Sequence, residues 1–176
     1  MKTGLVRALP LLLALSFSTQ AIADEARPKA SDFSLRTVTG ERVKLSDYQG
    51  KVVVLSFWAT WCGPCKQELP VLQKLADKHA AAGLAVVAVN IDDPKTVAEV
   101  RRFVADKKLK VPVPLDPEAE VLGKYNPKGS LPFLAIVDRQ GRRAFQHTGF
   151  GEGAEQQVEQ EIAQLLAEKP ATAAAP

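Results

Sequence analysis

The chain contains 176 residues, which corresponds to one domain and a remainder, because a typical domain has about 150 residues. Hydrophobic residues make up 46% and charged residues 24% of the chain, a globular composition that excludes a disordered chain, collagen and a coiled coil. Two cysteines are too few for a disulfide scaffold or a four-thiolate zinc site, and the net charge of +3 is only mildly basic.

The first 23 residues have the order of residue types that is typical of a secretory signal. Lys2 and Arg7 come first, an apolar stretch follows over residues 8–17, and the segment ends in small residues up to Ala23. This stretch of 10 residues is shorter than the roughly 20 that cross a bilayer, which disfavours the alternative of a retained membrane anchor. We therefore predict cleavage after Ala23, removal of residues 1–23 and a periplasmic location.

The signal accounts for most of the basic charge. Its removal takes away two of the 23 basic residues and none of the 20 acidic ones, which leaves a net charge of +1. The charge therefore gives no reason to expect nucleic acid as a partner. Residues 169–176 hold two prolines and no large apolar side chain, so we expect a disordered C-terminal tail. One folded domain, residues 24–168, remains between the signal and the tail.

The first half of this domain predicts a hairpin and two central strands. Residues 33–38 and 41–45 alternate between apolar and polar side chains around a turn, which is typical of a half-exposed hairpin. The continuous apolar runs 52–58 and 84–91 suit central strands that are covered on both faces. A helix is expected between these two strands, and Gly83 ends it.

The second half of the domain predicts further helices and a second hairpin. Residues 92–94, Asp-Asp-Pro, are a helix start. Prolines at 112, 114 and 117 bracket a predicted short strand and then a short helix over residues 118–125. Two strands over 133–137 and 142–148 enclose a turn, and a last helix follows Gly153. This order predicts an α/β sandwich with a mixed sheet.

Both cysteines lie in the segment Trp61-Cys62-Gly63-Pro64-Cys65, directly after the first central strand and at the start of a helix. There Cys62 meets unpaired backbone N–H groups and the positive end of the helix dipole, which stabilise a thiolate and lower the pKa of its thiol. Cys65 lies one turn further, near enough to form a disulfide. Attack by Cys62 on a substrate disulfide would give a mixed disulfide, which Cys65 then resolves.

Two other uses are compatible with a cysteine pair at this spacing. A structural disulfide would suit an exported chain, although so short a loop adds little stability through chain entropy. A zinc site would need two more ligands, and the only histidines, His79 and His147, are distant from the cysteines in sequence. We favour redox chemistry at Cys62 and Cys65, with no metal and no cofactor.

Residues 57–66, FWATWCGPCK, resemble the active-site segment of the thioredoxin fold. Within that fold, the chain resembles the TlpA/ResA-like thiol–disulfide oxidoreductases that bacteria export. The resemblance covers about residues 30–168 and includes the N-terminal hairpin, which thioredoxin lacks. Pro70 matches a proline inside the active-site helix of the fold. The resemblance implies a thioredoxin-like α/β sandwich, with a central mixed β-sheet flanked by helices and an extra N-terminal β-hairpin.

The resemblance also implies roles around the cysteines. Pro132 corresponds to the cis-proline that faces the active-site disulfide, and the backbone of Leu131 would offer a β-like contact to a substrate chain. We expect Trp61, Gly63 and Pro64 to form the rest of the substrate-binding rim.

A carboxyl group is expected near the cysteine pair as well. Thioredoxin buries an aspartate on the strand before the motif, where this chain has Ser56, which cannot carry a proton at neutral pH. The TlpA/ResA-like branch has a glutamate soon after the motif, and Glu68 matches it. We expect Glu68 to tune the thiols or to transfer a proton, and the alternative is an ordinary surface carboxylate.

These features predict an exported oxidoreductase that reduces protein disulfides. The Gly-Pro dipeptide between the cysteines is that of thioredoxin, a reductant with a potential near −270 mV. A reductant in an oxidising compartment needs its thiols renewed, and the resemblance implies a membrane electron donor of the CcdA/DsbD type. It also implies apocytochromes c as substrates, and thus a part in cytochrome c maturation. We expect a monomer.

Three other functions fit the sequence less well. A peroxiredoxin-like peroxidase would have Thr or Ser three residues before the reacting cysteine, where this chain has Ala59. An oxidant of the DsbA kind would carry a helical insertion, for which the spacing leaves no room. A non-catalytic binding or chaperone module usually loses one cysteine or the cis-proline, and this chain has both residues.

Overall fold

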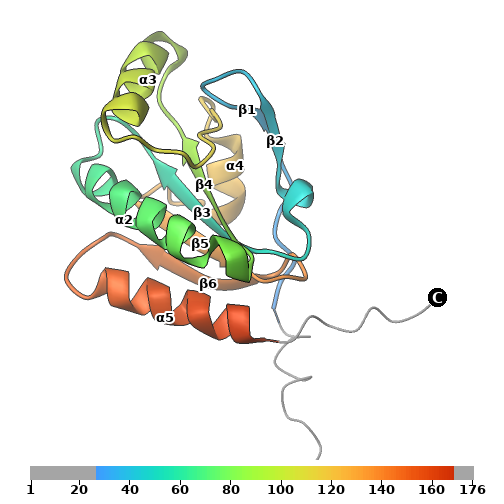
Figure 1. Ribbon diagram of the computed structural model, residues 1–176. Helices are drawn as coiled ribbons and strands as arrows, with labels where there is room; N and C mark the ends of the chain where they lie inside the picture. Colours follow the sequence, from blue (N-terminus) through green and yellow to red (C-terminus); the bar gives the residue numbers. More distant parts are fainter. Residues whose placement is uncertain (1–26, 169–176) are drawn as a thin grey trace, which may run out of the picture.

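A four-stranded mixed sheet forms the centre of the protein (Figure 1), in the order β4-β3-β5-β6. β3 (Val52–Trp58) runs parallel to β4 (Leu84–Asn90) and antiparallel to β5 (Phe133–Val137), which pairs antiparallel with β6 (Arg143–Thr148). This computed structural model describes residues 27–168, so the predicted signal and the predicted tail lie outside the described residues. The mixed sheet confirms the predicted α/β sandwich.

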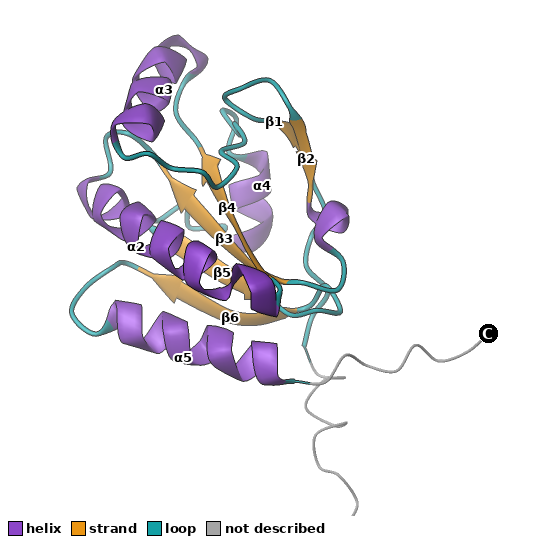
Figure 2. Ribbon diagram, in the orientation of Figure 1, coloured by secondary structure: helices purple, strands orange, loops and turns teal. Residues whose placement is uncertain are grey.

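Helices cover both faces of the sheet (Figure 2). α2 (Gly63–His79) and α5 (Ala154–Ala167) lie on one face. α4 (Glu120–Tyr125) covers the opposite face, together with the antiparallel hairpin of β1 (Ser34–Arg36) and β2 (Arg42–Lys44). The predicted N-terminal hairpin is therefore confirmed as an element separate from the central sheet.

A fourth α-helix and three short 3-10 helices complete the described chain. α3 (Val97–Asp106) contributes Val100 and Phe103 to the core beneath α2. Asp93 caps the turn before α3 by accepting a hydrogen bond from the backbone N–H of Lys95 at 2.8 Å, as the predicted helix start requires. The 3-10 helices are Leu45–Tyr48, Ala80–Ala82 and Pro94–Thr96.

β3 separates two apolar cores because successive side chains point to opposite faces of a strand. Its even-numbered residues face α2, α3 and α5, and its odd-numbered residues face α4 and the hairpin. All seven residues of β3 are buried, which explains why this segment appears in the sequence as a continuous apolar run. Ser56 is the polar exception, and it lies on the face that α2 covers.

The predicted strand between residues 112 and 117 is wrong. Only isolated bridges occur in this segment, between Pro114 and Thr37 and between Leu115 and Asn90. Pro112 and Pro114 have no backbone N–H, so a continuous ladder of hydrogen bonds cannot form there. The helix that follows, α4, begins at residue 120 and is two residues shorter than predicted.

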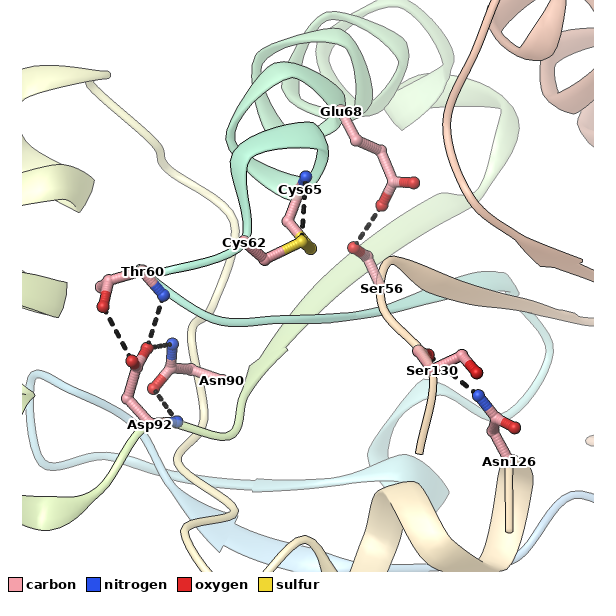
Figure 3. The surroundings of a disulfide bond; sticks show 9 residues. All are labelled: Ser56, Thr60, Cys62, Cys65, Glu68, Asn90, Asp92, Asn126 and Ser130. Atoms are coloured by element: carbon pink, nitrogen blue, oxygen red, sulfur yellow. Dashed lines mark hydrogen bonds between the residues drawn. A yellow bond between two sulfur atoms is a disulfide. The ribbon is translucent and has the colours of Figure 1, made fainter. Parts of the chain in front are cut away.

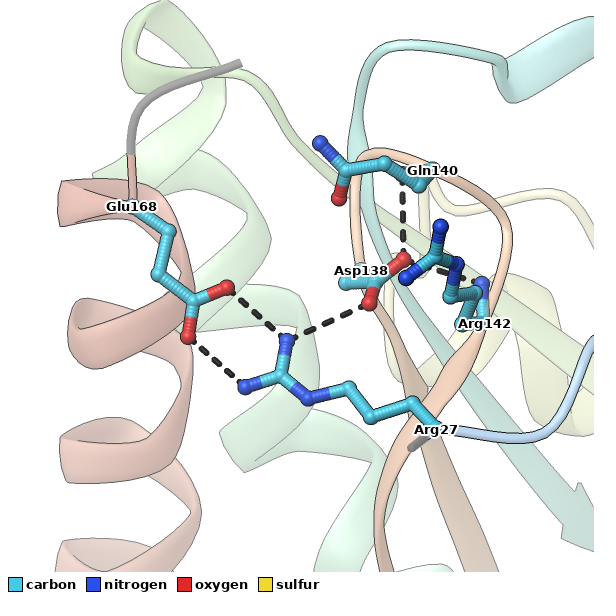
Figure 4. Close-up of polar contacts among 5 residues, drawn as sticks. All are labelled: Arg27, Asp138, Gln140, Arg142 and Glu168. Atoms are coloured by element: carbon cyan, nitrogen blue, oxygen red, sulfur yellow. Dashed lines mark hydrogen bonds and ion pairs between the residues drawn. The ribbon is translucent and has the colours of Figure 1, made fainter. Parts of the chain in front are cut away.

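One arginine joins the two ends of the described chain (Figure 4). Arg27 donates to both carboxylate oxygens of Glu168 at 2.8 Å, and its Nη1 also lies 3.2 Å from Oδ2 of Asp138. Asp138 is buried in the β5–β6 turn, where its Oδ1 accepts the backbone N–H groups of Gln140 and Arg142. Only 17% of the Arg27 side chain is exposed, so water competes weakly for these hydrogen bonds.

We expect Arg27→Ala to lower the free energy of unfolding by about 1–3 kcal/mol, because it removes charge-assisted hydrogen bonds and leaves the buried Asp138 without its cation. Arg27→Lys keeps the charge but not the paired geometry, so its loss should be intermediate. Urea unfolding measures both losses. Arg102→Ala, at an exposed site on α3, serves as the control. A loss as small for Arg27→Ala as for this control would contradict the prediction.

Candidate active site

The two cysteines form a disulfide at the start of α2 (Figure 3). Cys62 is the N-cap of α2, Cys65 lies in the first turn, and their Cα atoms are 5.3 Å apart. The Cys62 sulfur accepts a hydrogen bond from the backbone N–H of Cys65 at 3.3 Å. Cys62 is 6% exposed, whereas Cys65 is completely buried. A substrate can therefore reach the sulfur of Cys62 first, and the helix start stabilises negative charge on that same sulfur.

Residues that precede and follow Cys62 form an exposed rim. Trp61 is 70% exposed, and it is the only large hydrophobic side chain with such exposure among residues 27–168. Gly63 and Pro64 are also exposed, in the first turn of α2. The apolar ring of Trp61 and the small residues Gly63 and Pro64 thus lie at the surface beside the disulfide.

The segment before β5 lies beside the end of β3. The Leu131–Pro132 peptide bond is cis, as predicted. Phe133 pairs with Phe57 near the end of β3, which places this segment next to the point where the cysteine loop leaves the sheet. Pro132 is buried and Leu131 is half-buried, so Leu131 is the more accessible of the two predicted contacts.

Glu68 lies inside the protein. It is 2% exposed and follows Cys65 by one helical turn on the buried face of α2. Its Oε1 accepts a hydrogen bond from the Ser56 hydroxyl on β3 at 2.6 Å (Figure 3). Burial raises the pKa of Glu68 to about 7, although the hydrogen bond from Ser56 acts in the opposite direction. The alternative of an ordinary surface carboxylate is therefore wrong.

A cavity of about 450 Å³ extends from Glu68 toward β6. Leu134 and His147 also line it. Ser56, Leu134 and His147 are directly opposite one another across β3, β5 and β6, so their side chains share the face that α2 and α5 cover. His147 Nε2 lies 2.6 Å from Oε2 of Glu161 on α5. Glu68 therefore borders this cavity although its side chain is almost completely buried.

The raised pKa of Glu68 predicts how stability depends on pH. This carboxyl titrates near 4.5 in the unfolded chain and at about 7 in the folded protein, so folding is coupled to proton binding between these values. The stabilisation is complete below pH 4.5 and is lost as the pH rises through about 7, and the total is about 3 kcal/mol.

Glu68→Gln removes this titration. We expect the free energy of unfolding of the variant, relative to the wild-type protein, to rise by about 2–3 kcal/mol between pH 5 and pH 8. Urea titrations at the two pH values measure this change. Glu99→Gln, at an exposed site on α3, should show no such rise. The same difference at both pH values for Glu68→Gln would contradict the prediction.

The structure contains a polar network beside the cysteine loop that the sequence did not predict. Asp92 follows β4 and is 4% exposed, and its carboxylate accepts hydrogen bonds from Thr60 and Asn90. The parallel arrangement of two predicted strands could have indicated this network. β3 and β4 are parallel, so the residues after both strands meet at one edge of the sheet. The polar residues after β4 in the sequence therefore indicate side chains close to the loop that carries the cysteines.

The histidines contact glutamates of α5 instead of joining the cysteines. His79 Nε2 lies 3.2 Å from Glu159, and His147 contacts Glu161. Within residues 27–168, no group of three or more His, Cys, Asp or Glu side chains is placed to hold a metal ion. None of the helices in this described part is both long and apolar enough to cross a membrane.

A disulfide at the start of the helix that follows the central strand, in a mixed sheet with this order, defines a thioredoxin-like protein. The model of the AhpC/TSA family matches residues 26–142, and the chain belongs to this family.

Relatives with established names agree with this class. The chain is 35% identical over 137 residues to the thiol-disulfide oxidoreductase ResA of Geobacillus kaustophilus, which covers 78% of this chain and 77% of the relative. It is 37% identical over 148 residues to the thioredoxin-like protein YneN of Bacillus subtilis, with 84% of each chain covered. The crystal structure of a putative thiol:disulfide interchange protein DsbE from Chlorobium tepidum is similar, with a TM-score of 0.73 and 37% identity over 80% of this chain and 96% of that chain.

The comparisons confirm the predicted fold class and the predicted resemblance to ResA-like proteins. They also confirm that the enzyme class is thiol–disulfide oxidoreductase, which acts on protein thiols and disulfides.

Proposed function

We propose that this protein is an exported reductant of protein disulfides, in which Cys62 attacks the substrate and Cys65 resolves the mixed disulfide. One observation carries this proposal. A disulfide whose outer cysteine is the N-cap of α2 lies one helical turn from a buried carboxyl group, that of Glu68, whose pKa burial raises to about 7.

The first step uses the helix start. In the reduced protein, the Cys62 thiolate is stabilised by the backbone N–H of Cys65 and by the helix dipole. It attacks one sulfur of the substrate disulfide, which forms a mixed disulfide and releases the other substrate sulfur as a thiolate. Trp61 and the half-buried Leu131 flank the attacked bond, one by its exposed ring and the other by its backbone.

The second step requires a proton to leave Cys65. Burial in apolar surroundings disfavours the Cys65 thiolate, so a nearby base is needed. Glu68, on the same face of α2, accepts this proton when its carboxyl group is ionised. The Cys65 thiolate then attacks the Cys62 sulfur, closes the intramolecular disulfide and releases the substrate as a dithiol. Two electrons pass from the cysteine pair to the substrate.

The proposed setting is the periplasm. The sequence of residues 1–23 supports export with cleavage after Ala23. A membrane protein of the CcdA/DsbD type would reduce Cys62 and Cys65 again after each cycle, because an oxidising compartment removes electrons from a reductant. Apocytochromes c are the proposed substrates, which would give the protein a part in cytochrome c maturation. We propose that it acts as a monomer.

The reduction potential of the Cys62/Cys65 pair tests the direction of electron flow. Equilibration of the full-length protein with redox buffers, followed by thiol alkylation and mass measurement, gives this potential. We expect a value near that of thioredoxin, about −270 mV. A value near −120 mV, which is typical of DsbA, would replace the proposed reductant by an oxidant.

A further inference from the structure

We propose that Asp92 is a positioning residue for this chemistry, which holds the loop before Cys62 so that the Cys62 sulfur stays against the backbone N–H groups at the start of α2. The inference rests on the proposed role of Cys62 as the attacking sulfur.

The Asp92 carboxylate binds the loop at a single residue, Thr60 (Figure 3). Its Oδ2 accepts the backbone N–H of Thr60 at 2.8 Å, and its Oδ1 accepts the Thr60 hydroxyl at 2.7 Å. Oδ2 also accepts a hydrogen bond from Nδ2 of Asn90 at 2.6 Å, and Oδ1 of Asn90 accepts the backbone N–H of Asp92 at 3.2 Å. Three donors fix the orientation of a carboxylate that is 4% exposed.

The support for Asp92 is itself rigid. Asn90 is completely buried at the end of β4, where its backbone N–H donates to Pro114 at 2.8 Å and its carbonyl accepts from Asp116 at 2.8 Å. The backbone N–H of Ile91 donates to the carbonyl of Trp58 at 3.0 Å and ties the end of β4 to the end of β3. Asp92 therefore anchors the loop to the sheet.

Thr60 lies two residues before Cys62, and the loop is short. The backbone N–H of Cys62 donates to Ala59 at 3.1 Å, so the residues between β3 and α2 form one tight turn. The Cys62 sulfur keeps its 3.3 Å hydrogen bond to the N–H of Cys65 only while this turn holds Cys62 in the N-cap position. If Thr60 loses its anchor, the sulfur can move away from the helix start, and the thiolate loses stabilisation.

Two other roles for Asp92 predict different results. A carboxylate that acts through its negative charge disfavours a nearby thiolate, so its removal would lower the pKa of Cys62. A carboxylate that only stabilises the fold would leave the pKa of Cys62 unchanged. A positioning role predicts a rise in this pKa, whether the anchor is broken at Asp92 or at Thr60. The sign of the change therefore separates the three roles.

The experiment measures the rate of Cys62 alkylation by iodoacetamide against pH in the reduced full-length protein, with mass spectrometry to identify the modified cysteine. Asp92→Asn removes the charge and sets an amide against the Thr60 donors. Thr60→Val keeps the charge, the shape and the backbone N–H but removes the hydroxyl donor. Thr60→Ser restores that hydroxyl as the conservative variant.

We expect Asp92→Asn and Thr60→Val to raise the pKa of Cys62, by about one unit for the aspartate variant. At a pH below that pKa, this corresponds to an about tenfold slower alkylation. Thr60→Ser should restore the wild-type profile. Because a destabilised thiolate favours the oxidised state, the reduction potential should become more negative in the two impaired variants.

A lower thermal midpoint without a change in the pKa of Cys62 would overturn the proposal in favour of a structural role. A lower pKa in Asp92→Asn, with no change in Thr60→Val, would overturn it in favour of a charge effect. Thr60→Val keeps the buried Asp92–Asn90 contact, so it supplies the test if Asp92→Asn does not fold. A Cys62 that alkylates slowly at every pH in the wild-type protein would refute the proposed function itself, which is a different result.

Discussion

Cys62→Ser should abolish disulfide reduction, whereas Cys65→Ser should stop the reaction at the mixed disulfide. Cys62 supplies the only sulfur of the pair that substrate can approach, because Cys65 is completely buried. We expect the turnover rate of Cys62→Ser to fall by a factor on the order of 10³ or more, as for the loss of other nucleophiles. Cys65→Ser keeps the attacking thiolate but cannot release the substrate.

Intact-protein mass spectrometry distinguishes these two outcomes. With a disulfide-bonded peptide as substrate, Cys65→Ser should gain the mass of one peptide strand, and Cys62→Ser should gain none. Trapping of the peptide by Cys62→Ser, through Cys65, would reverse the proposed order of attack. The same Cys65→Ser variant, produced in full length in bacteria, would retain natural substrates as mixed disulfides. Apocytochromes c among them would support the proposed role in cytochrome c maturation.

Trp58→Ala should cause the largest loss of stability. The side chain of Trp58 is completely buried, and its ring lies 5.1 Å from that of Phe103 on α3. Its Nε1 donates to the carbonyl of Ala88 on β4 at 3.2 Å. Replacing a buried aromatic residue by alanine costs about 3–5 kcal/mol, because a cavity remains where the ring was. The free energy of unfolding measured in urea should fall by this amount.

Trp61→Ala provides a matched control three residues further along the chain. Trp61 is 70% exposed, so its removal should change the free energy of unfolding by less than about 0.5 kcal/mol. It should instead weaken substrate binding, which appears as a higher KM for a protein disulfide. Equal losses of stability in the two tryptophan variants would show that Trp58 is not the core residue described above.

The fold was predictable where the hydrophobic pattern of a single segment reflects which of its faces are buried. β3 and β4 are covered on both faces, so their sequences are continuous apolar runs, and the hairpin of β1 and β2 alternates because one of its faces is exposed to solvent. The segment around Pro112 and Pro114 has apolar residues at strand-like spacing, but its missing N–H groups decide its structure. Hydrophobic pattern alone does not contain that information.

The part of the site formed by residues close together in the sequence was predictable. Cys62 and Cys65 are three residues apart at the start of a helix, so their spacing in the sequence already predicts that they lie close together. The hydrogen bond between Ser56 and Glu68 joins β3 to α2, and the contact between Thr60 and Asp92 joins two loops 32 residues apart. Such contacts depend on the order and register of the strands, which composition and spacing do not specify.

The ion-pair cluster of Arg27, Asp138 and Glu168 lies at the end of β5 that is opposite to Pro132. β5 has five residues, each of which advances the chain by about 3.3 Å. The ion-pair cluster and the cysteine loop therefore lie at opposite ends of the strands. Residues 27 and 168, the two ends of the described part, lie on the side of the domain away from the start of α2 (Figure 1). A tether attached at residue 27 or at residue 168 would therefore lie on the opposite side of the domain from the Cys62–Cys65 disulfide and would leave that disulfide open to large substrates.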